Sequence, residues 1–316
     1  MRGGGVLAKV LVLGAGAVGG YFGARLAEKG VDVTFLVRER RRKQLQERGL
    51  RVQSVHGDIH LEQPGTIVSG ESAGPFDVIL LSNKAYHLED SIEAIAAYVG
   101  EQTVILPLLN GIAHMERLWE KFGRHQVLGG LCFIETTLNE EGDVVQTSQT
   151  NEMVFGEWAG GESERVEALK QAFSGTKASI RASADIQRDM WQKYLFITTL
   201  SGITTLMNSS VGPIRDAVYG LELTRQLAEE SAAVMRKLGA PIDPDVVDKQ
   251  MDTFMKQGYR MKASMLRDME KGLPVEADHL QGYLIRKADQ LGMSVPLLKV
   301  VYNNLKVYEL KREAAK

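Results

Sequence analysis

The sequence has little cysteine, no long run of apolar residues and no excess charge of either sign. Its single cysteine, Cys132, cannot form an internal disulfide, which favours a reducing compartment. No uninterrupted apolar run approaches the roughly 18–20 residues that a membrane helix needs. The 38 Lys and Arg residues stand against 40 Asp and Glu residues, which leaves a formal net charge of −2. This balance indicates no nucleic acid and no anionic membrane as a partner.

Several kinds of site are also missing. The six histidines and Cys132 form no cluster with the spacing of metal ligands, so no metal site is predicted. No Gly-x-Ser-x-Gly motif marks a serine nucleophile.

Met1-Arg2 and the apolar residues after them superficially resemble a signal peptide, but Lys9 interrupts the apolar stretch, and cleavage would destroy the glycine motif that follows. We therefore expect a soluble, cytoplasmic protein.

The length of 316 residues, of which 44% are hydrophobic, favours two domains rather than one. Near Ala184 the pattern changes from alternating strands and helices to continuous helical periodicity. We expect residues 1–184 to form a Rossmann-type α/β domain and residues 185–316 to form an all-helical domain. The parallel sheet of the first domain should be extended by antiparallel strands between Val127 and Phe155.

What the sequence does contain, close to its start, is the pattern of a strand, a glycine turn and a helix. The apolar run Val10–Leu13 leads into Gly14-x-Gly16-x-x-Gly19. In such a unit the first glycine allows the tight turn, the second lets the backbone approach a pyrophosphate, and the third lets the helix pack closely on the strand. The N–H groups at the helix start favour phosphate. We predict a dinucleotide site made by Gly14, Ala15, Gly16, Ala17, Val18 and Gly19. The alternative is that the glycines serve only a tight turn.

A second predicted strand, Val31–Val37, ends directly at Arg38. Dehydrogenases that prefer NAD usually carry Asp or Glu at about this place to bind the ribose 2′-hydroxyl, whereas a basic residue fits a 2′-phosphate. The basic residues from Arg38 to Lys43 therefore favour NADPH as the cofactor. The alternative is the solvated, basic start of a helix.

Two further predicted strands, at 77–81 and 103–109, end at polar residues. Lys84 follows the first strand, and Asn110-Gly111 follows the second. Because ligands of open α/β sheets lie at the carboxyl ends of the strands, both side chains are candidates for a cofactor site. Seen singly, a loop lysine and an Asn-Gly turn are the ordinary interpretations.

In the second half, Lys193 lies in the middle of a predicted helix that begins near Asp185 and is apolar on all sides. An ammonium in such surroundings costs several kcal/mol unless it is paired, hydrated or neutralised. Lys193 is therefore a candidate for chemistry. The alternative is a lysine whose head extends past its apolar neighbours to solvent.

Three more helices are predicted, at about 214–239, 243–272 and 275–292. Ser264 lies within the second of them. Glu276 opens the third, where the helix dipole favours a carboxylate. Taken alone, each would be an ordinary helix residue.

The order of these motifs resembles that of the ketopantoate reductase (2-dehydropantoate 2-reductase) family over nearly the whole chain. The motifs are, in order, Gly14-x-Gly16-x-x-Gly19, Lys84, Asn110-Gly111, Trp191-Gln192-Lys193, Ser264-Met-Leu-Arg-Asp268, Glu276, Gly282-Tyr-Leu-Ile-Arg286 and Gly292-Met-Ser-Val-Pro296. The resemblance implies an N-terminal Rossmann domain, a helical C-terminal domain and NADPH as cofactor. It also implies the reduction of 2-dehydropantoate to (R)-pantoate, a step of pantothenate biosynthesis.

The resemblance further implies roles for single residues. Lys193 matches the catalytic lysine of the family and would act as the general acid. We assign Glu276 to catalysis beside it. We assign Ser264, Ser201 and Asn110 to substrate binding, and Lys84 together with Asn110 to the nicotinamide end of the cofactor site.

The chain departs from the family where asparagines usually follow the lysine after four and eight residues. Ile197 and Ser201 stand there, and a further asparagine expected after this helix is Val211, with Asn208 nearby. Lost amides weaken the recognition of polar substrate groups. Two alternatives follow, namely a reductase of another 2-oxo acid on the same fold and a non-catalytic NADP-sensing protein. A homodimer would suit the apolar helical half.

Overall fold

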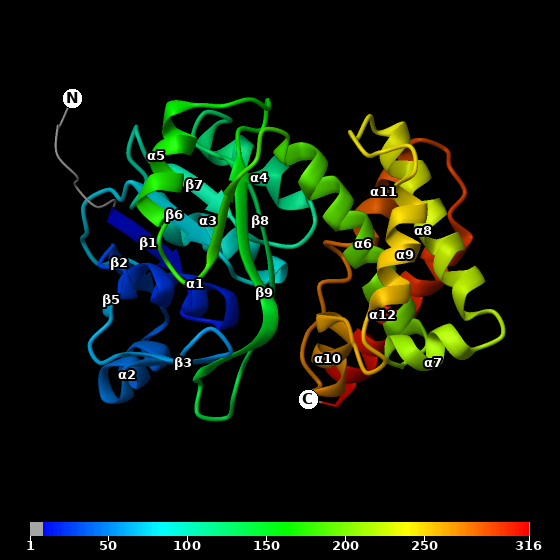
Figure 1. Cartoon of the computed structure of the whole chain (residues 1–316), viewed down its shortest axis with the longest axis horizontal. Coiled ribbons are helices and arrows are strands. Elements are labelled where there is room, and N and C mark those ends of the chain that lie inside the picture. Colours follow the sequence, from blue (N-terminus) through cyan, green and yellow to red (C-terminus); the bar gives the residue numbers. More distant parts are fainter. Residues whose placement is uncertain (1–8, 316) are drawn as a thin grey trace. The chain divides into compact units, whose positions relative to one another are not determined.

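The computed structural model describes residues 9–315, which fold into two compact units (Figure 1). The first unit contains the chain up to Leu109 together with His114–Ile186, and the second contains Asn110–Ala113 and the chain from Gln187 onward. Met1-Arg2, which resembles the start of a signal peptide, lies outside the described residues. The boundary predicted between residues 184 and 185 stays a prediction.

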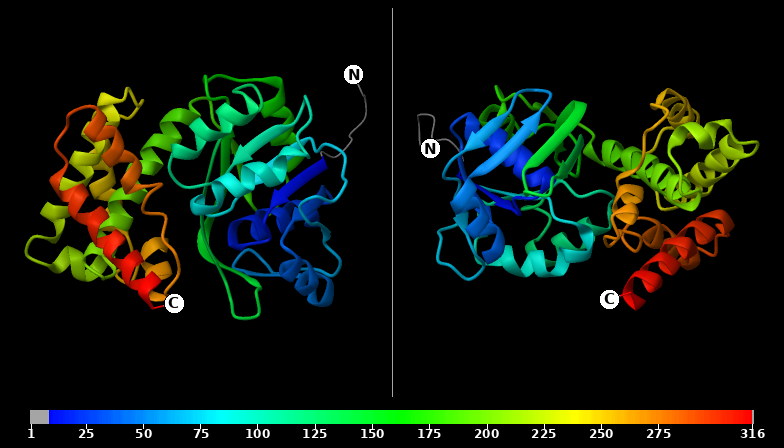
Figure 2. Two further views of the ribbon diagram at one scale, coloured as in Figure 1. Left: turned by 180° about the vertical axis from the view of Figure 1, so that it is seen from behind. Right: turned by 90° about the horizontal axis from the view of Figure 1, so that it is seen from below.

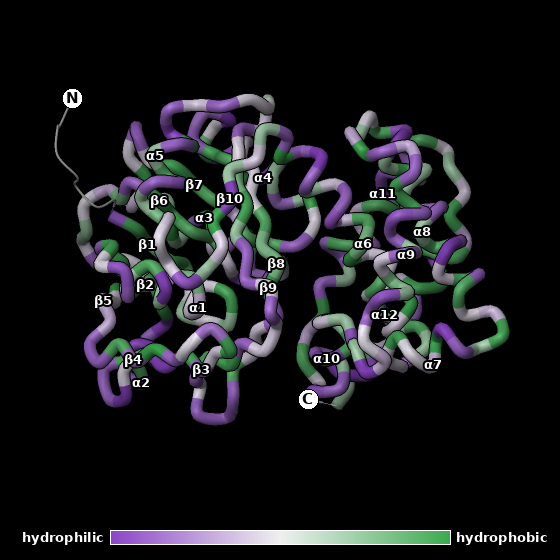
Figure 3. Tube along the Cα trace, in the orientation of Figure 1, coloured by the Kyte–Doolittle hydropathy of each residue, from purple (hydrophilic) through white to green (hydrophobic). Residues whose placement is uncertain are grey.

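The first unit is built on a parallel sheet with the strand order β5-β2-β1-β6-β7. Its strands are β1 (Lys9–Leu13), β2 (Asp32–Leu36), β5 (Gly65–Ile67), β6 (Val78–Leu81) and β7 (Val104–Pro107). Its helices are α1 (Ala17–Glu28), α2 (Glu39–Arg48), the short η1 (Ala85–His87), α3 (Leu88–Ala96) and α4 (Ala113–Phe122). Apart from Lys9, the central strands β1, β6 and β7 consist of apolar residues (Figure 3), as expected of a parallel sheet that is covered on both faces. The predicted Rossmann-type fold is confirmed.

The antiparallel pair predicted between Val127 and Phe155 forms, but in a second sheet. The pair consists of β8 (Gly129–Leu138) and β9 (Val144–Gly156), and it joins β3 (Leu50–Ser54), β4 (Ile59–Leu61) and β10 (Ser179–Ala182). Within residues 9–315, only the bridge between Ile105 and Val127 continues the parallel sheet. The reason lies in α1, whose residues from Gly19 to Leu26 are all buried. A helix that is buried all round needs cover on both sides.

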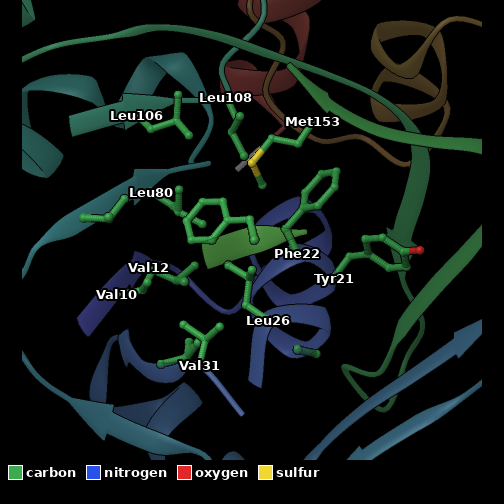
Figure 4. Packing of buried hydrophobic residues seen from close by; sticks show 14 of the residues in the cluster. Val10, Val12, Tyr21, Phe22, Leu26, Val31, Leu80, Leu106, Leu108 and Met153 are labelled. Atoms are coloured by element: carbon green, nitrogen blue, oxygen red, sulfur yellow. The ribbon is translucent and has the colours of Figure 1, made fainter. Parts of the chain in front are cut away.

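Close packing joins α1 to the parallel sheet. Phe22 and Leu26 of the helix belong to the same buried cluster as Val12 and Leu80 of the strands, and Figure 4 shows Leu26 extending toward Val12. On the other side, Tyr21 accepts a hydrogen bond of 2.8 Å at its hydroxyl from Asn151 Nδ2 of β9. The remaining element of this unit is helix α5, Glu164–Phe173.

The second unit is all helical, as predicted (Figure 2). Its helices are α6 (Ile186–Leu206), α7 (Val211–Asp216), α8 (Gly220–Lys237), α9 (Val246–Lys256), α10 (Ser264–Glu270), α11 (Gln281–Gln290) and α12 (Pro296–Ala314). The helix predicted at 214–239 is thus divided into α7 and α8, and α12 had no counterpart among the predicted helices. Within residues 9–315, no helix combines the length and the apolar composition that a membrane span requires.

The single helix predicted at 243–272 is wrong. The chain leaves α9 at Gln257, whose ψ of 145° is extended, and α10 begins only at Ser264. The backbone between them pairs with the start of α7, since Val211 N donates to Met261 O at 2.9 Å and Gly212 N donates to Tyr259 O at 2.9 Å. These tertiary hydrogen bonds outweigh the helical propensity of the segment.

The helix predicted from Val275 is also placed wrongly, because α11 begins at Gln281. Glu276 instead opens a turn, and its carbonyl accepts hydrogen bonds from His279 N at 3.2 Å and from Leu280 N at 3.0 Å. The Asp278 carboxylate holds the turn by accepting a hydrogen bond of 3.0 Å from Lys306 Nζ of α12. The predicted gain of Glu276 from a helix dipole therefore does not apply.

We predict that Gly19→Ala destabilises the first unit. A Cβ at this position would overlap Ser82 Oγ and the Gly14 carbonyl oxygen and would lie 3.1 Å from Val12 Cγ1. Because backbone and two strands would have to shift, we expect a loss of about 1–3 kcal/mol, measured as the free energy of unfolding in urea.

Gly16→Ala is the matched control, since no atom lies within 4 Å of a Cβ built at Gly16. It should change the free energy of unfolding by less than about 0.5 kcal/mol. An unchanged stability of Gly19→Ala would contradict the close packing described above.

Candidate cofactor and catalytic sites

The glycine turn follows β1 in the first unit and opens onto the start of α1. Gly14 has a φ of +87°, and its N–H donates to Leu36 O of β2 at 2.9 Å. Gly16 stands at the N-cap of α1 without a side chain that could cap the first N–H groups. Those N–H groups and the open space at Gly16 fit an anionic group such as a pyrophosphate.

The turn lies where the order of the parallel sheet reverses. Strand β1 has β2 on one side and β6 on the other, and the chain reaches β6 only after passing through β5 at the edge. Dinucleotides bind at such a switch point, outside the carboxyl ends of the strands. The backbone therefore provides, in the first unit alone, the features that a dinucleotide site needs.

The basic residues after β2 do not share one environment. Arg38 is exposed at the N-cap of α2, where its charge faces solvent. Arg42 is bound to Glu71 by an ion pair of 2.5 Å. Arg41 is half-buried, and its guanidinium donates to the Ala15 carbonyl oxygen of the glycine turn at 2.9 Å. The sequence pattern gave these cations as one cluster and did not distinguish their partners.

Lys84 follows β6 at the same edge of the parallel sheet. It is half-buried and forms the N-cap of η1. The Asn83 side-chain nitrogen donates to the Lys84 carbonyl oxygen at 3.0 Å, and Ser82 Oγ donates to Leu13 O of β1 at 3.3 Å. The carboxyl ends of β1 and β6 are thus joined directly beside the glycine turn.

In the second unit, Lys193 and Asn110 meet. The Lys193 ammonium, half-buried on α6, donates a hydrogen bond of 3.0 Å to Asn110 Oδ1. Asn110 belongs to the short segment Asn110–Ala113, which packs with the helical unit rather than with the strand before it. The two residues are 83 positions apart in sequence, so this contact is a product of the tertiary fold.

A turn that precedes α11 fixes Asn110. Gly111 has a φ of +84°, and a Cβ there would lie 2.9 Å from Leu280 Cδ2 and 3.2 Å from His279 Cδ2. The same turn is tied to α6, because the Tyr194 hydroxyl donates to Leu280 O at 2.6 Å. Three segments of the second unit therefore converge on the pair of Lys193 and Asn110.

His279 is a member of this group that the sequence analysis missed. Burial lowers the pKa of its imidazole, while the charge of Glu276 and a hydrogen bond to the Asn110 backbone oppose that shift. The histidine thus lies next to two predicted site residues. The one available signal was its position three residues after Glu276.

The remaining predicted substrate residues differ in exposure. Ser264 is exposed as the first residue of α10. Ser201 is buried within α6, and its hydroxyl accepts a hydrogen bond of 2.9 Å from Gln281 Nε2 of α11. Ile197 is half-buried one turn after Lys193. The roles of Ser264, Ser201 and Glu276 remain predictions.

Within residues 9–315, no three His, Cys, Asp or Glu side chains lie together as a metal site would require. Cys132 is buried.

Comparison with known proteins gives matches over almost the whole chain. The sequence model described as "Ketopantoate reductase PanE/ApbA" matches residues 10–160, and its C-terminal counterpart matches residues 185–309. The chain is 47% identical over 304 residues to "Uncharacterized oxidoreductase YkpB" of Bacillus subtilis, covering 96% of this chain and 100% of that relative. It is 27% identical to a 2-dehydropantoate 2-reductase of a Nostoc species, covering 94% of each chain.

Solved structures share the fold. The crystal structure of 2-dehydropantoate 2-reductase from Geobacter metallireducens matches with a TM-score of 0.86 and 28% identity, over 94% of this chain and 98% of that one. A structure of D-mandelate dehydrogenase with NADH and anilino(oxo)acetate matches with the same TM-score at 19% identity, over 96% of this chain and 99% of that one. The second likeness shows the fold alone.

The environment of His279 generates a prediction on pH. Because burial lowers its folded-state pKa, the unfolded chain binds a proton more readily than the native chain as pH falls below about 6.5. The contribution of His279 to stability is therefore complete above that pH and declines below it. We expect the urea midpoint to fall between pH 7.5 and pH 5.5, and to fall less in His279→Gln.

His125→Gln is the control, because His125 is exposed. It should keep the pH dependence of the unmodified protein. A His279→Gln protein with an undiminished dependence would show that His279 is not the titrating group.

Proposed function

Because the chain belongs to the ketopantoate reductase family, we propose that it reduces 2-dehydropantoate to (R)-pantoate with NADPH, as a step of pantothenate biosynthesis. The coarser activity follows from the family: the chain is an NAD(P)-dependent oxidoreductase that acts on CH–OH groups. The observation that supports the proposal best is the hydrogen bond between Lys193 and Asn110.

In this proposal the glycine turn binds the cofactor. The uncapped N–H groups at the start of α1 would receive the pyrophosphate, and the absence of a side chain at Gly16 would allow its close approach. Arg38, exposed at the end of β2, would bind the 2′-phosphate of NADPH. Lys84, at the end of β6, would border the nicotinamide end. A bound nicotinamide dinucleotide supplies the hydride.

Lys193 would supply the proton. Hydride addition to the carbonyl carbon of a 2-oxo acid leaves negative charge on the carbonyl oxygen. An ammonium at that oxygen stabilises the charge and then donates a proton from Nζ. The Asn110 amide oxygen accepts a hydrogen bond from the ammonium and so helps to orient Nζ.

Glu276 would act beside Lys193, and Ser264 would bind the substrate. Glu276 lies close enough to His279 for its charge to act on that imidazole. His279 is in turn hydrogen-bonded to the backbone of Asn110. This chain of contacts supports a place for Glu276 near the lysine, in the role that the family resemblance implies.

A reductase of another 2-oxo acid on the same fold is a second candidate, supported by the environments of Ile197 and Ser201. Ile197 offers no hydrogen bond to a substrate, and the Ser201 hydroxyl is bound by Gln281 inside the helix packing. The sensor alternative has less support, because a protein that only binds NADP does not need an ordered pair of Lys193 and Asn110. The cytoplasmic location and the homodimer remain predictions.

We predict that Lys193→Ala lowers kcat about 10²- to 10⁴-fold, because the proton donor is lost, while the affinity for NADPH changes by less than about twofold. Steady-state kinetics and a fluorescence titration with NADPH measure the two effects. Lys237→Ala, at an exposed position in the last turn of α8, is the control and should keep full activity. Near-normal turnover of Lys193→Ala would exclude the proposed general acid.

The substrate is tested by NADPH oxidation with a panel of 2-oxo acids that includes 2-dehydropantoate, repeated with NADH. We expect the highest kcat/KM for 2-dehydropantoate with NADPH. A higher value for a different 2-oxo acid would establish the second candidate. Tight NADPH binding without turnover of any member would establish the sensor.

A further inference from the structure

The turn of the β8–β9 hairpin, residues 139–143, is fastened to helix α2 in the first unit. The Glu141 carbonyl oxygen accepts hydrogen bonds from Gln44 Nε2 and, at 3.1 Å, from Arg48 NH1. Arg48 also forms an ion pair of 3.9 Å with Asp143. Two side chains of α2, one helical turn apart, therefore donate hydrogen bonds to the backbone of a turn that lies almost a hundred residues later in the sequence.

The turn itself is closed by two hydrogen bonds between its ends. Asn139 N donates to Asp143 O at 3.0 Å, and Asp143 N donates to Asn139 Oδ1 at 2.8 Å. Gly142 adopts a φ of +80°, which disfavours other residues. Directly after the turn, Val144 is fully buried against α1, where it would lie 2.8 Å from a Cβ at Gly20. The β8–β9 hairpin thus contacts α1 through Val144 and α2 through its turn.

Arg41 lies between these two anchor points. One end of its guanidinium donates to Ala15 O in the glycine turn at 2.9 Å, and the other donates to Gln44 Oε1 at 2.6 Å. Arg41 Nε is buried and has no hydrogen-bond partner among residues 9–315. Gln44 therefore connects Arg41 to the hairpin turn, because the same side chain binds Glu141.

The hairpin turn also limits the space around Arg41. A Cβ at Gly142 would overlap Gln44 Nε2 and lie 2.7 Å from Arg41 NH1. The absence of a side chain at residue 142 is thus a condition for the present position of the guanidinium. Burial lowers the pKa of the Arg41 guanidinium, and the charge of Asp143 in the turn opposes that shift.

We propose that Arg41 is a second contact for the 2′-phosphate of NADP(H), beside Arg38, and that the hairpin turn 139–143 holds Arg41 in place. The proposal rests on the proposed cofactor site. The 2′ substituent of the adenosine ribose would be held by residues that follow the second strand, where Arg41 reaches back to the glycine turn. Arg42 forms an ion pair with Glu71, whereas the buried Nε–H of Arg41 has no hydrogen-bond partner among residues 9–315.

Binding of adenosine 2′,5′-bisphosphate and of 5′-AMP, measured by calorimetry, isolates the 2′-phosphate. Gly142→Ala should weaken adenosine 2′,5′-bisphosphate about tenfold, because a displaced Arg41 loses a charge-assisted contact. The affinity for 5′-AMP should change by less than about twofold. Arg41→Gln should give the same selective loss.

Gly161→Ala is the matched control. Gly161 has a φ of +83°, like Gly142, but no atom lies within 4 Å of a Cβ built there. The variant carries the same backbone strain without a contact to α2, and should keep both affinities. The double variant Gly142→Ala/Arg41→Gln completes a cycle: if the turn acts through Arg41, Gly142→Ala adds less than about twofold once Arg41 is gone.

The outcomes separate this inference from the proposed cofactor. An unmodified protein that binds both nucleotides equally would refute the NADP preference and this inference with it. Two other results would refute this inference alone. One is that Gly142→Ala weakens the binding of 5′-AMP as much as that of the bisphosphate. The other is that Gly142→Ala has an undiminished effect on bisphosphate binding in the Arg41→Gln background.

Discussion

The close contact between helix α1 and the parallel sheet is the constraint on which the first unit depends. At Gly19 the backbone of the helix lies against the Gly14 carbonyl oxygen and Ser82, with no room for a methyl group. The contact fixes the start of the helix over the carboxyl end of β1 and leaves its first N–H groups without a side-chain cap. One steric condition thus provides both the packing of the core and the geometry of an anion site.

In the second unit the constraint is different, because an ammonium group lies on a helix that is mostly surrounded by apolar side chains. Lys193 is only half-buried, and Asn110 Oδ1 accepts a hydrogen bond from it. An amide oxygen accepts a hydrogen bond from the ammonium without adding a negative charge, so it helps to orient Nζ. His279 and Gly111 contribute by holding the segment that carries Asn110.

The sequence was sufficient for the features that local patterns determine. The glycine motif, the strand ends at Lys84 and Asn110, and the helical second half all follow from periodicity and turn chemistry. The breaks in that half did not follow, because they depend on partners distant in sequence. The end of α9 is decided by backbone pairing with residues 211–212, and the late start of α11 by the contacts of Asp278 with α12. The contact of Arg41 with the Ala15 carbonyl oxygen could not be predicted for the same reason, because it depends on the tertiary fold.

The departure at residues 197 and 201 bears on how a substrate could be selected. The Gln281 side chain of α11 brings an amide to Ser201 of α6, but this amide donates its hydrogen bond to the Ser201 hydroxyl and so joins the two helices. Ile197 lies one helical turn after Lys193, on the same face of α6. A 2-oxo acid bound at Lys193 would therefore meet methyl groups at that point. Shape discriminates by only about 1–3 kcal/mol per methylene group, whereas a hydrogen-bonding site rejects an analogue that lacks the matching group about 10⁴-fold or more. Selectivity for a hydroxylated substrate would then depend on polar side chains of other elements, and Ser264, at the exposed start of α10, is the residue predicted for that role.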